Sequence, residues 1–258
     1  MSGKGAPDSS EKATSSRDEG VVDKIRAAGG EIYAVTSEPQ RVADDAREDW
    51  QLTFEVVGDP HHEIVSTCRD CGWLELVINT RTELFEQQKD SSFSHPKGYF
   101  QPGVLALDKT GRVLYRWRGV PTRSNLGGAV ERPTAEYVFE KISAALDTPA
   151  NAETSDAELD LRPELDSRGI PWPAFMSILT ANGWFIKPRP FPHLPNGPPL
   201  RRRFLRALSR IPLFILAWVV AFSLLPPVWV GAALVAWVIW IIPQIRFISE
   251  QFQSVEPP

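Results

Sequence analysis

The hydrophobic pattern divides the chain into a body of mixed polar and apolar residues and an apolar C-terminal tail. The 35 residues at 211–245 carry no charge, and nearly all of them are large and apolar. As one helix this run would measure roughly 50 Å, which exceeds the hydrocarbon core of a bilayer at about 30 Å. Pro226 and Pro227 lie near its middle and cannot continue an ordinary helix. The pattern therefore predicts a membrane hairpin of two helical segments, 212–225 and 228–242.

Each predicted segment is about 22 Å long, so the hairpin is either transmembrane or re-entrant. One alternative is a single span over about 223–242, with the preceding segment in the membrane interface. The other is a buried hairpin in the core of a soluble protein. The aromatic content of the run favours the membrane, because indole rings prefer the headgroup region. Four tryptophans fall in it: Trp218, Trp229, Trp237 and Trp240.

Charge is distributed unevenly along the chain. Residues 201–258 have a net charge of +4, and residues 1–200 have a net charge of −8. The arginines that immediately precede the apolar run are Arg201, Arg202, Arg203, Arg206 and Arg210. By the positive-inside rule this flank stays in the cytoplasm, so we expect membrane localisation with the N-terminal domain on the cytoplasmic side. The lipid bilayer is the expected partner, whereas the acidic body argues against nucleic-acid binding, which needs a basic surface.

Composition predicts a series of distinct regions. The first 20 residues lack the apolar core of a signal peptide, and their Ser, Gly, Asp and Lys content is typical of disorder. The regions that follow are a folded domain at 21–146, a Pro-rich and acidic linker at 147–200, the basic flank and hairpin at 201–245, and a tail at 246–258. An apolar island at 172–184 interrupts the linker, and it lies either on the membrane or against the domain.

Helix and strand patterns alternate in the first part of the folded domain. Gly29 and Gly30 close a helix at 21–28. Ser37 is placed to cap the next helix, with Gln40 as its capping-box partner. The elements expected after the first helix are a strand at 31–36, a helix ending near Trp50, a strand at 53–57, a helix at 61–70 and a strand at 74–78, followed by a loop or insertion at 79–100.

The second part of the domain reads as a hairpin followed by a helix. Residues 104–107 and 112–117 alternate apolar and polar side chains around an Asp-Lys-Thr-Gly turn, which predicts two antiparallel strands. Pro133 opens a final helix at 134–146, which has one apolar face. The order of elements therefore predicts a mixed α/β domain.

Four segments resemble successive passages of the peroxiredoxin-like family, which includes alkyl hydroperoxide reductase and thiol-specific antioxidant proteins. They are IRAAGGEIYAVTSEP, FEVVGDP, QPGVLALDKTGRVLYRWRG and NLGGAVERPTAEYVFEKISAAL, within residues 21–146. The resemblance implies an α/β thioredoxin-like fold that is incomplete at the N-terminus. It also implies an antioxidant thiol oxidoreductase that reduces peroxides or disulfides, with a thioredoxin or another thiol donor as partner. No cofactor and no metal are expected.

The resemblance also implies roles for particular residues. Pro102 occupies the place where thioredoxin-like folds have a cis-proline that faces the active-site cysteine. Arg132 and Glu136 match an Arg-x-x-x-Glu of the family, so Arg132 would help to bind a peroxide or stabilise a thiolate. The family's reactive cysteine, however, stands at the start of the first helix, and no cysteine precedes Cys68 here. Either the domain has lost peroxidase chemistry or the full protein is longer at its N-terminus.

The two cysteines of the chain, Cys68 and Cys71, form a C-x-x-C motif. In redox proteins this spacing places two sulfurs at a helix N-terminus, whose dipole stabilises the thiolate. Here the pair falls at the C-terminal end of its predicted helix, where the dipole has the opposite sign and Arg69 would compensate only in part. A metal site that adds His61 or His62 is a second interpretation, and two cysteines without a special role are a third.

These observations leave three hypotheses for function. The first is a membrane-anchored thiol oxidoreductase that uses Cys68 and Cys71 as catalytic groups, with Arg132 in support. The second is a non-catalytic interaction module that keeps the fold at the membrane without the chemistry. The third is a tail that recruits or shapes membrane, with the domain as its cargo.

Overall fold

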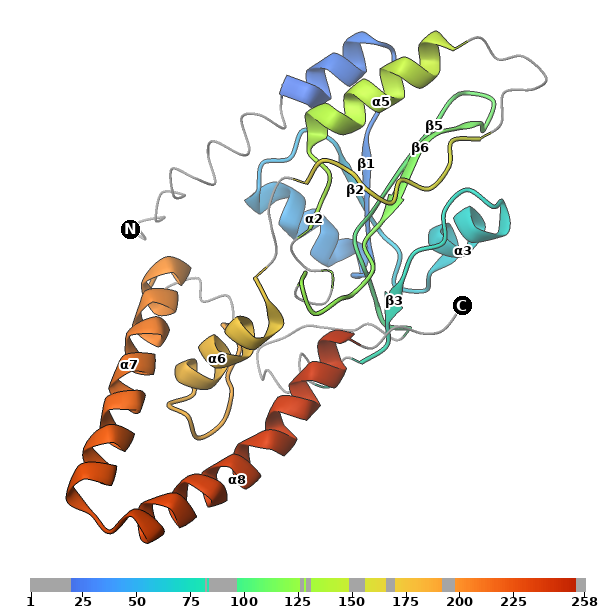
Figure 1. The fold of residues 1–258 in the computed structure, drawn as a ribbon. Coiled ribbons are helices and arrows are strands. Elements are labelled where there is room, and N and C mark those ends of the chain that lie inside the picture. The colour runs from blue at the N-terminus through green and yellow to red at the C-terminus, as the bar shows by residue number, and fades with distance from the viewer. Residues whose placement is uncertain are drawn as a thin grey trace. The chain divides into compact units, whose positions relative to one another are not determined.

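The computed structural model describes residues 20–81, 83, 97–125, 128, 131–148, 156–165, 170–191 and 198–253. The chain forms two compact units (Figure 1). The α/β unit contains the described residues of 1–120 and 131–168, and the helical unit contains those of 121–130 and 169–254. The short segment at 121–130 therefore groups with the helical unit, although the sequence analysis assigns it to the folded domain.

The α/β unit begins with a helix at 20–27 that ends as the sequence predicts. Gly29 adopts a φ of +79°, and its N–H donates to the carbonyl oxygen of Arg26 at 2.9 Å. Gly30 donates to the carbonyl oxygen of Ile25 at 2.9 Å. This pair of bonds closes the helix because glycine enters the left-handed region without steric cost.

The next three elements are strand β1 at Tyr33–Thr36, helix α2 at Gln40–Asp49 and strand β2 at Glu55–Gly58. The strands β1 and β2 run parallel, and helix α2 packs on β2. This β-α-β order confirms the predicted sequence of elements. Each strand begins two residues later than predicted.

The predicted capping box at the start of α2 is wrong. The N-cap residue is Pro39, which makes no side-chain cap hydrogen bond. The Gln40 amide instead donates to the carbonyl oxygen of Val56 at 2.9 Å and accepts from the N–H of Gly58 at 2.8 Å. A Cβ at position 58 would lie 2.6 Å from the backbone nitrogen of Gln40, so glycine is required for this close approach.

Helix α3 at Glu63–Asp70 follows β2 and is capped by Asp59. The Asp59 carboxylate accepts from the N–H groups of Glu63 at 2.6 Å and of Ile64 and Val65 at 3.1 Å. An acidic side chain at this end also interacts favourably with the helix dipole. The Gly-Asp-Pro segment therefore both ends β2 and starts α3.

Two antiparallel pairs complete the strands of this unit. Strand β3 at Ile78–Asn79 pairs with β4 at Tyr99–Phe100, and β5 at Gly103–Leu107 pairs with β6 at Val113–Arg118. The second pair is the predicted hairpin, whereas only the end of the strand expected at 74–78 joins a ladder. In the part of the chain that the structure describes, the six strands form three separate two-stranded sheets.

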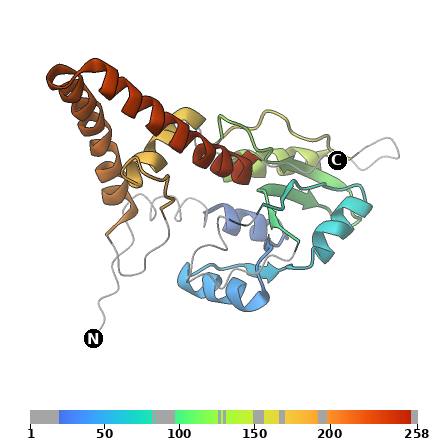
Figure 2. The same cartoon turned by 90° about the horizontal axis from the view of Figure 1, so that it is seen from below.

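Helix α5 at Ala135–Asp147 confirms the predicted last helix, and it packs on β6 (Figures 1 and 2). Thr134 caps it by accepting from the N–H of Tyr137 at 3.3 Å. The observed unit is thus of the mixed α/β class that the sequence predicts.

Part of the expected linker belongs to the α/β unit. The backbone at 156–165 follows β6: Ala157 donates to the carbonyl oxygen of Val113 and Asp160 to that of Arg116, both at 3.0 Å. One Asp160 oxygen also accepts from the hydroxyls of Tyr115 at 3.1 Å and Tyr137 at 2.8 Å. This segment is ordered because it satisfies backbone groups along an otherwise open strand edge.

The helical unit consists of α6 at Trp172–Asn182, α7 at Leu200–Leu224 and α8 at Pro227–Gln253. The break between α7 and α8 falls at Leu225, which is extended, and Pro226. The two predicted helical segments, separated at the proline pair, are therefore confirmed, and no continuous helix covers 223–242 because the break falls within that range. Both helices run further than predicted and continue through Pro212 and Pro243.

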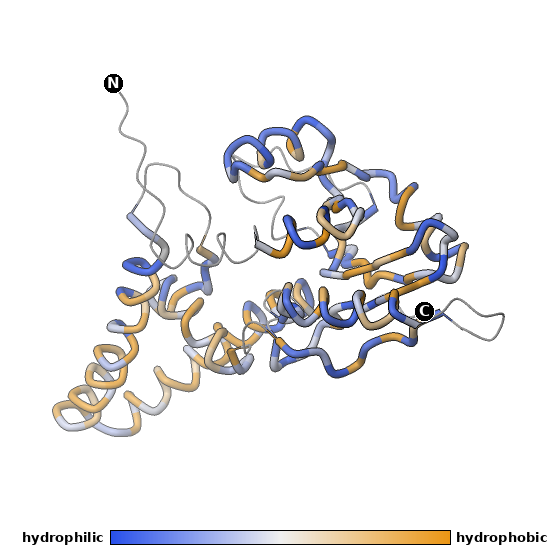
Figure 3. The backbone as a smooth tube through the Cα atoms, turned by 90° about the horizontal axis from the view of Figure 1, so that it is seen from above, coloured by the Kyte–Doolittle hydropathy of each residue, from blue (hydrophilic) through white to orange (hydrophobic). Residues whose placement is uncertain are grey.

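Both long helices expose many large apolar side chains, and Figure 3 shows that hydrophobic residues predominate along them. Only 6% and 11% of their most apolar windows, within 201–224 and 227–252, are buried, whereas the core helices of a soluble protein are mostly buried. The two helices are long and apolar enough to cross a membrane. The exposure of the apolar side chains of α7 and α8 argues against the alternative in which the hairpin is buried in the core of a soluble protein.

Candidate functional site

The C-x-x-C pair lies at the C-terminal end of α3, as the sequence predicts. Cys68 is in the last turn and half-buried, and Cys71 is the C-cap residue and exposed. Both are free thiols. The Cys68 carbonyl oxygen accepts from the N–H groups of Trp73 at 2.9 Å and Leu74 at 3.3 Å, which ends the helix and positions both cysteines.

The electrostatic surroundings of Cys68 oppose ionisation. Burial raises the pKa of the Cys68 thiol, and the neighbouring Cys71 and Asp59 raise it further. The guanidinium of Arg69, the residue next to Cys68 in sequence, lies 3.3 Å from the Asp70 carboxylate and is therefore paired with it. Since the thiolate is the nucleophile, this arrangement disfavours nucleophilic chemistry at Cys68.

We expect slow alkylation of Cys68 at neutral pH. In a Cys71→Ser chain, the rate with iodoacetamide at pH 7.5 should be at least about three-fold below that of a free cysteine peptide, because a raised pKa lowers the thiolate fraction. The rate should keep rising with pH beyond the point where the peptide levels off. Mass spectrometry of time points at each pH measures both, with Cys68→Ser as the matched variant that reports on Cys71. A rate at pH 7.5 above that of the peptide would contradict this account of the site.

His61 and His62, which lie just before α3, are the histidines that a metal site with the two cysteines would use. The His62 ring is buried, donates from Nε2 to the carbonyl oxygen of Gly98 at 3.2 Å, and packs on Phe100 with a centroid distance of 4.8 Å. Among the described residues, no group of three or more His, Cys, Asp or Glu side chains could hold a metal ion. The structure therefore gives the metal interpretation no support.

Arg132 lies in a different part of the α/β unit from the cysteines. Arg132 is an exposed residue, and the partial desolvation of its guanidinium by neighbouring atoms lowers the pKa of this group. It precedes α5, which packs on β6, and Figure 1 draws α3 away from α5. Cys68 and Cys71 therefore lie at the end of α3 and Arg132 lies before α5, and α5 packs on β6.

The expectation of a cis-proline at position 102 is wrong. No peptide bond among the described residues is cis. Gln101 donates to the carbonyl oxygen of Val77 at 2.8 Å, and the Pro102 carbonyl oxygen accepts from Gly119 at 2.7 Å. These bonds hold the segment extended between the two antiparallel pairs, in the trans form that is favoured by about 0.5–1 kcal/mol before proline.

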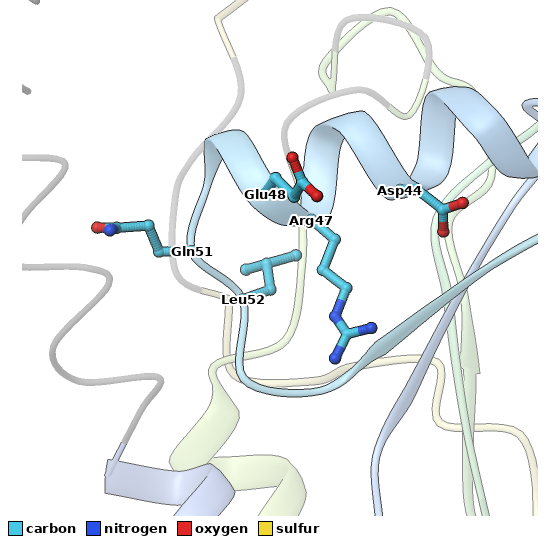
Figure 4. A pocket seen from close by; sticks show the side chains of 5 residues that line it. All are labelled: Asp44, Arg47, Glu48, Gln51 and Leu52. Atoms are coloured by element: carbon cyan, nitrogen blue, oxygen red, sulfur yellow. The ribbon is translucent and has the colours of Figure 1, made fainter.

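A shallow hollow lies at the C-terminal end of α2 (Figure 4). The side chains that line it are Asp44, Arg47, Glu48, Gln51 and Leu52. Arg47 is paired with Glu55 at 2.8 Å on β2. The described residues that line the hollow include no cysteine, serine, threonine or histidine.

A second cluster, which the sequence analysis did not identify, lies in the helical unit. Arg210 on α7 donates to the carbonyl oxygens of Ala181 at 3.2 Å and Asn182 at 2.9 Å. Its guanidinium also lies 4.1 Å from the centroid of the Trp184 ring. The only signal in the sequence was the aromatic end of the apolar island at 172–184, which does not identify its partners.

Comparison with known proteins finds no matching family model, no similar curated protein and no similar solved structure.

Proposed function

We propose that this chain is a membrane-anchored protein in which the hairpin of α7 and α8 holds the α/β unit at the cytoplasmic face of a lipid bilayer. The observation that carries the proposal is the apolar surface that both helices present outward along the charge-free run at 211–245. Such a surface is unfavourable in water and favourable in lipid. The arginines at the start of α7 support the cytoplasmic orientation.

Within this proposal, the α/β unit is a peroxiredoxin-like domain of the thioredoxin-like class that acts as a non-catalytic interaction module. The β1-α2-β2 order followed by β5-β6-α5 supports the class, together with the resemblance of the four quoted segments. The raised pKa of Cys68 and the separate position of Arg132 support the absence of catalysis. Attachment to a bilayer would then concentrate the partner of this domain at the membrane surface.

The native thiols test the orientation directly. Exposed Cys71 should react with a membrane-impermeant maleimide in inverted vesicles from cells that express the full chain, and not in intact cells, because the α/β unit faces the cytoplasm. Mass-shift labelling followed by gel electrophoresis measures this, and detergent-solubilised membranes give the fully labelled control. Equal labelling of intact cells and inverted vesicles would overturn the orientation.

A second candidate is a thiol oxidoreductase that receives electrons from a thioredoxin or another thiol donor. It is favoured by the exposure of Cys71 three residues from Cys68. The alkylation profile distinguishes the two candidates, because an active thiol requires a pKa near or below that of a free cysteine. The module predicts that Cys68→Ser and Cys71→Ser chains retain every membrane and partner-binding property of the unsubstituted chain.

A further inference from the structure

Helix α6 and the turn after it form a third apolar element of the helical unit. Trp172, Met176 and Leu179 of α6 are buried in a cluster with Ile248 of α8. Helix α6 also packs along α7. The apolar island at 172–184 is therefore part of the unit that contains the hairpin, and it lies against both hairpin helices.

The turn at 183–186 presents apolar side chains outward. Trp184 and Phe185 have φ values of +56° and +60°, which non-glycine residues adopt rarely. Their backbone directs the chain so that the Trp184 and Ile186 side chains remain 65% and 66% exposed. A turn with two left-handed residues that exposes two large apolar side chains to water would be unfavourable both in backbone conformation and in solvation.

Side chains from both hairpin helices satisfy carbonyl oxygens of this turn. Arg210 of α7 bonds those of Ala181 and Asn182. On α8, the Trp237 indole donates to the Phe185 carbonyl oxygen at 2.6 Å and the Trp240 indole to that of Ile186 at 2.9 Å. Non-helical backbone enters a bilayer only where its polar groups have hydrogen-bond partners. The bonds to these carbonyl oxygens therefore lower the free-energy cost of moving the turn from water into lipid.

The aromatic contacts place the turn beside the charge-free run. The Phe185 ring stacks on Phe214 of α7 with a centroid distance of 3.8 Å, and Phe214 lies 5.1 Å from Trp237 of α8. Phe214 is four residues beyond Arg210, or about 6 Å along the helix towards the hairpin tip. Trp237 is nine residues before Arg246, or about 13 Å along α8. The turn therefore lies further into the apolar run than the charges that flank it.

We propose that the turn at 183–186 inserts into the cytoplasmic leaflet as a third membrane-contacting segment, with Trp184 and Ile186 in contact with lipid. This inference rests on the proposed hairpin anchor and extends its surface. The bilayer is the occupant because the exposed side chains are continuous with the apolar surface of α7 and α8, and because Arg210 holds a positive charge beside them for lipid phosphate.

The test uses the full chain in vesicles of phosphatidylcholine and phosphatidylglycerol. A Cys68→Ser, Cys71→Ser background carries one new cysteine, at Ile186→Cys, labelled with the fluorophore NBD. Leu161→Cys, on an exposed position of the α/β unit, is the aqueous control, and Val219→Cys, on an exposed position of α7 within the charge-free run, is the bilayer control. Quenching is measured with aqueous iodide and with lipids that carry a nitroxide near the headgroup or deep in the acyl chain.

We expect iodide to quench the probe at position 186 at least three-fold less than the probe at 161, and shallow nitroxide lipids to quench it most. Iodide quenching equal to that at 161, or shielding from both iodide and nitroxides, would overturn the inference, since the turn would then face water or pack on protein. If the probe at 219 is shielded from iodide and quenched by nitroxide lipids in that case, the anchor stands without this third segment. Iodide quenching at 219 as strong as at 161 would overturn the anchor itself.

Discussion

A chain that carries Val219→Asp and Ile239→Asp should no longer integrate into membranes. Val219 on α7 and Ile239 on α8 are 55% and 67% exposed in the charge-free run, so each aspartate would face lipid. An aspartate near the centre of a membrane helix costs about 2.5–3.5 kcal/mol on insertion scales, and two should shift the insertion equilibrium by several orders of magnitude. Flotation of membranes on a density gradient measures the fraction that remains bound, which we expect to be small for the double variant.

The matched control is Leu161→Asp in the α/β unit, which adds a negative charge at an exposed apolar position. It should float with the membranes like the unsubstituted chain, because that position faces water. Flotation of the double variant in the same proportion as the control would contradict lipid contact by these helix faces.

Replacement of Asp160 by alanine should lower the free energy of unfolding of the α/β unit by roughly 2–4 kcal/mol, because two tyrosine hydroxyls lose a charged acceptor. Tyr115 is only 4% exposed, so water cannot easily replace the lost partner. Burial and the Asp160 charge raise the pKa of Tyr115, which keeps its hydroxyl protonated as a donor. Pulse proteolysis of the full chain in urea measures the unfolding midpoint.

Asp160→Asn is the matched variant, because its amide oxygen still accepts a hydrogen bond at nearly the same volume. It should lose less stability than Asp160→Ala, since the acceptor remains and only the charge is removed. Equal midpoints for Asp160→Ala and the unsubstituted chain would show that the segment at 156–165 does not stabilise β6 and α5.

Local sequence patterns were sufficient to predict an element where one short stretch of residues determines its structure. The β5–β6 hairpin follows from alternating side chains around the turn at Asp108 and Gly111, and the hairpin break follows from Pro226. The cysteine pair was placed correctly at the end of α3 for the same reason. In each case the decisive residues are neighbours in sequence.

Long-range partners could not be predicted from those patterns. Gln40 bonds the strand residues Val56 and Gly58 instead of forming a capping box, since the strand offers backbone groups 16 and 18 residues away. The acidic segment around Asp160 was assigned to a linker, although its carboxylate meets tyrosines on two other elements. The turn at 183–186 depends on donors more than 25 residues further along the chain.

The most direct test of the membrane anchor is alkaline carbonate extraction of membranes that contain the full chain, followed by protease digestion of the pellet and mass spectrometry. Lipid-embedded helices resist both treatments, because neither reagent enters the hydrocarbon core. We predict that the chain stays in the pellet and that the protected peptides cover α7 and α8 across the Pro226–Pro227 break. Release of the intact chain into the carbonate supernatant would contradict the account.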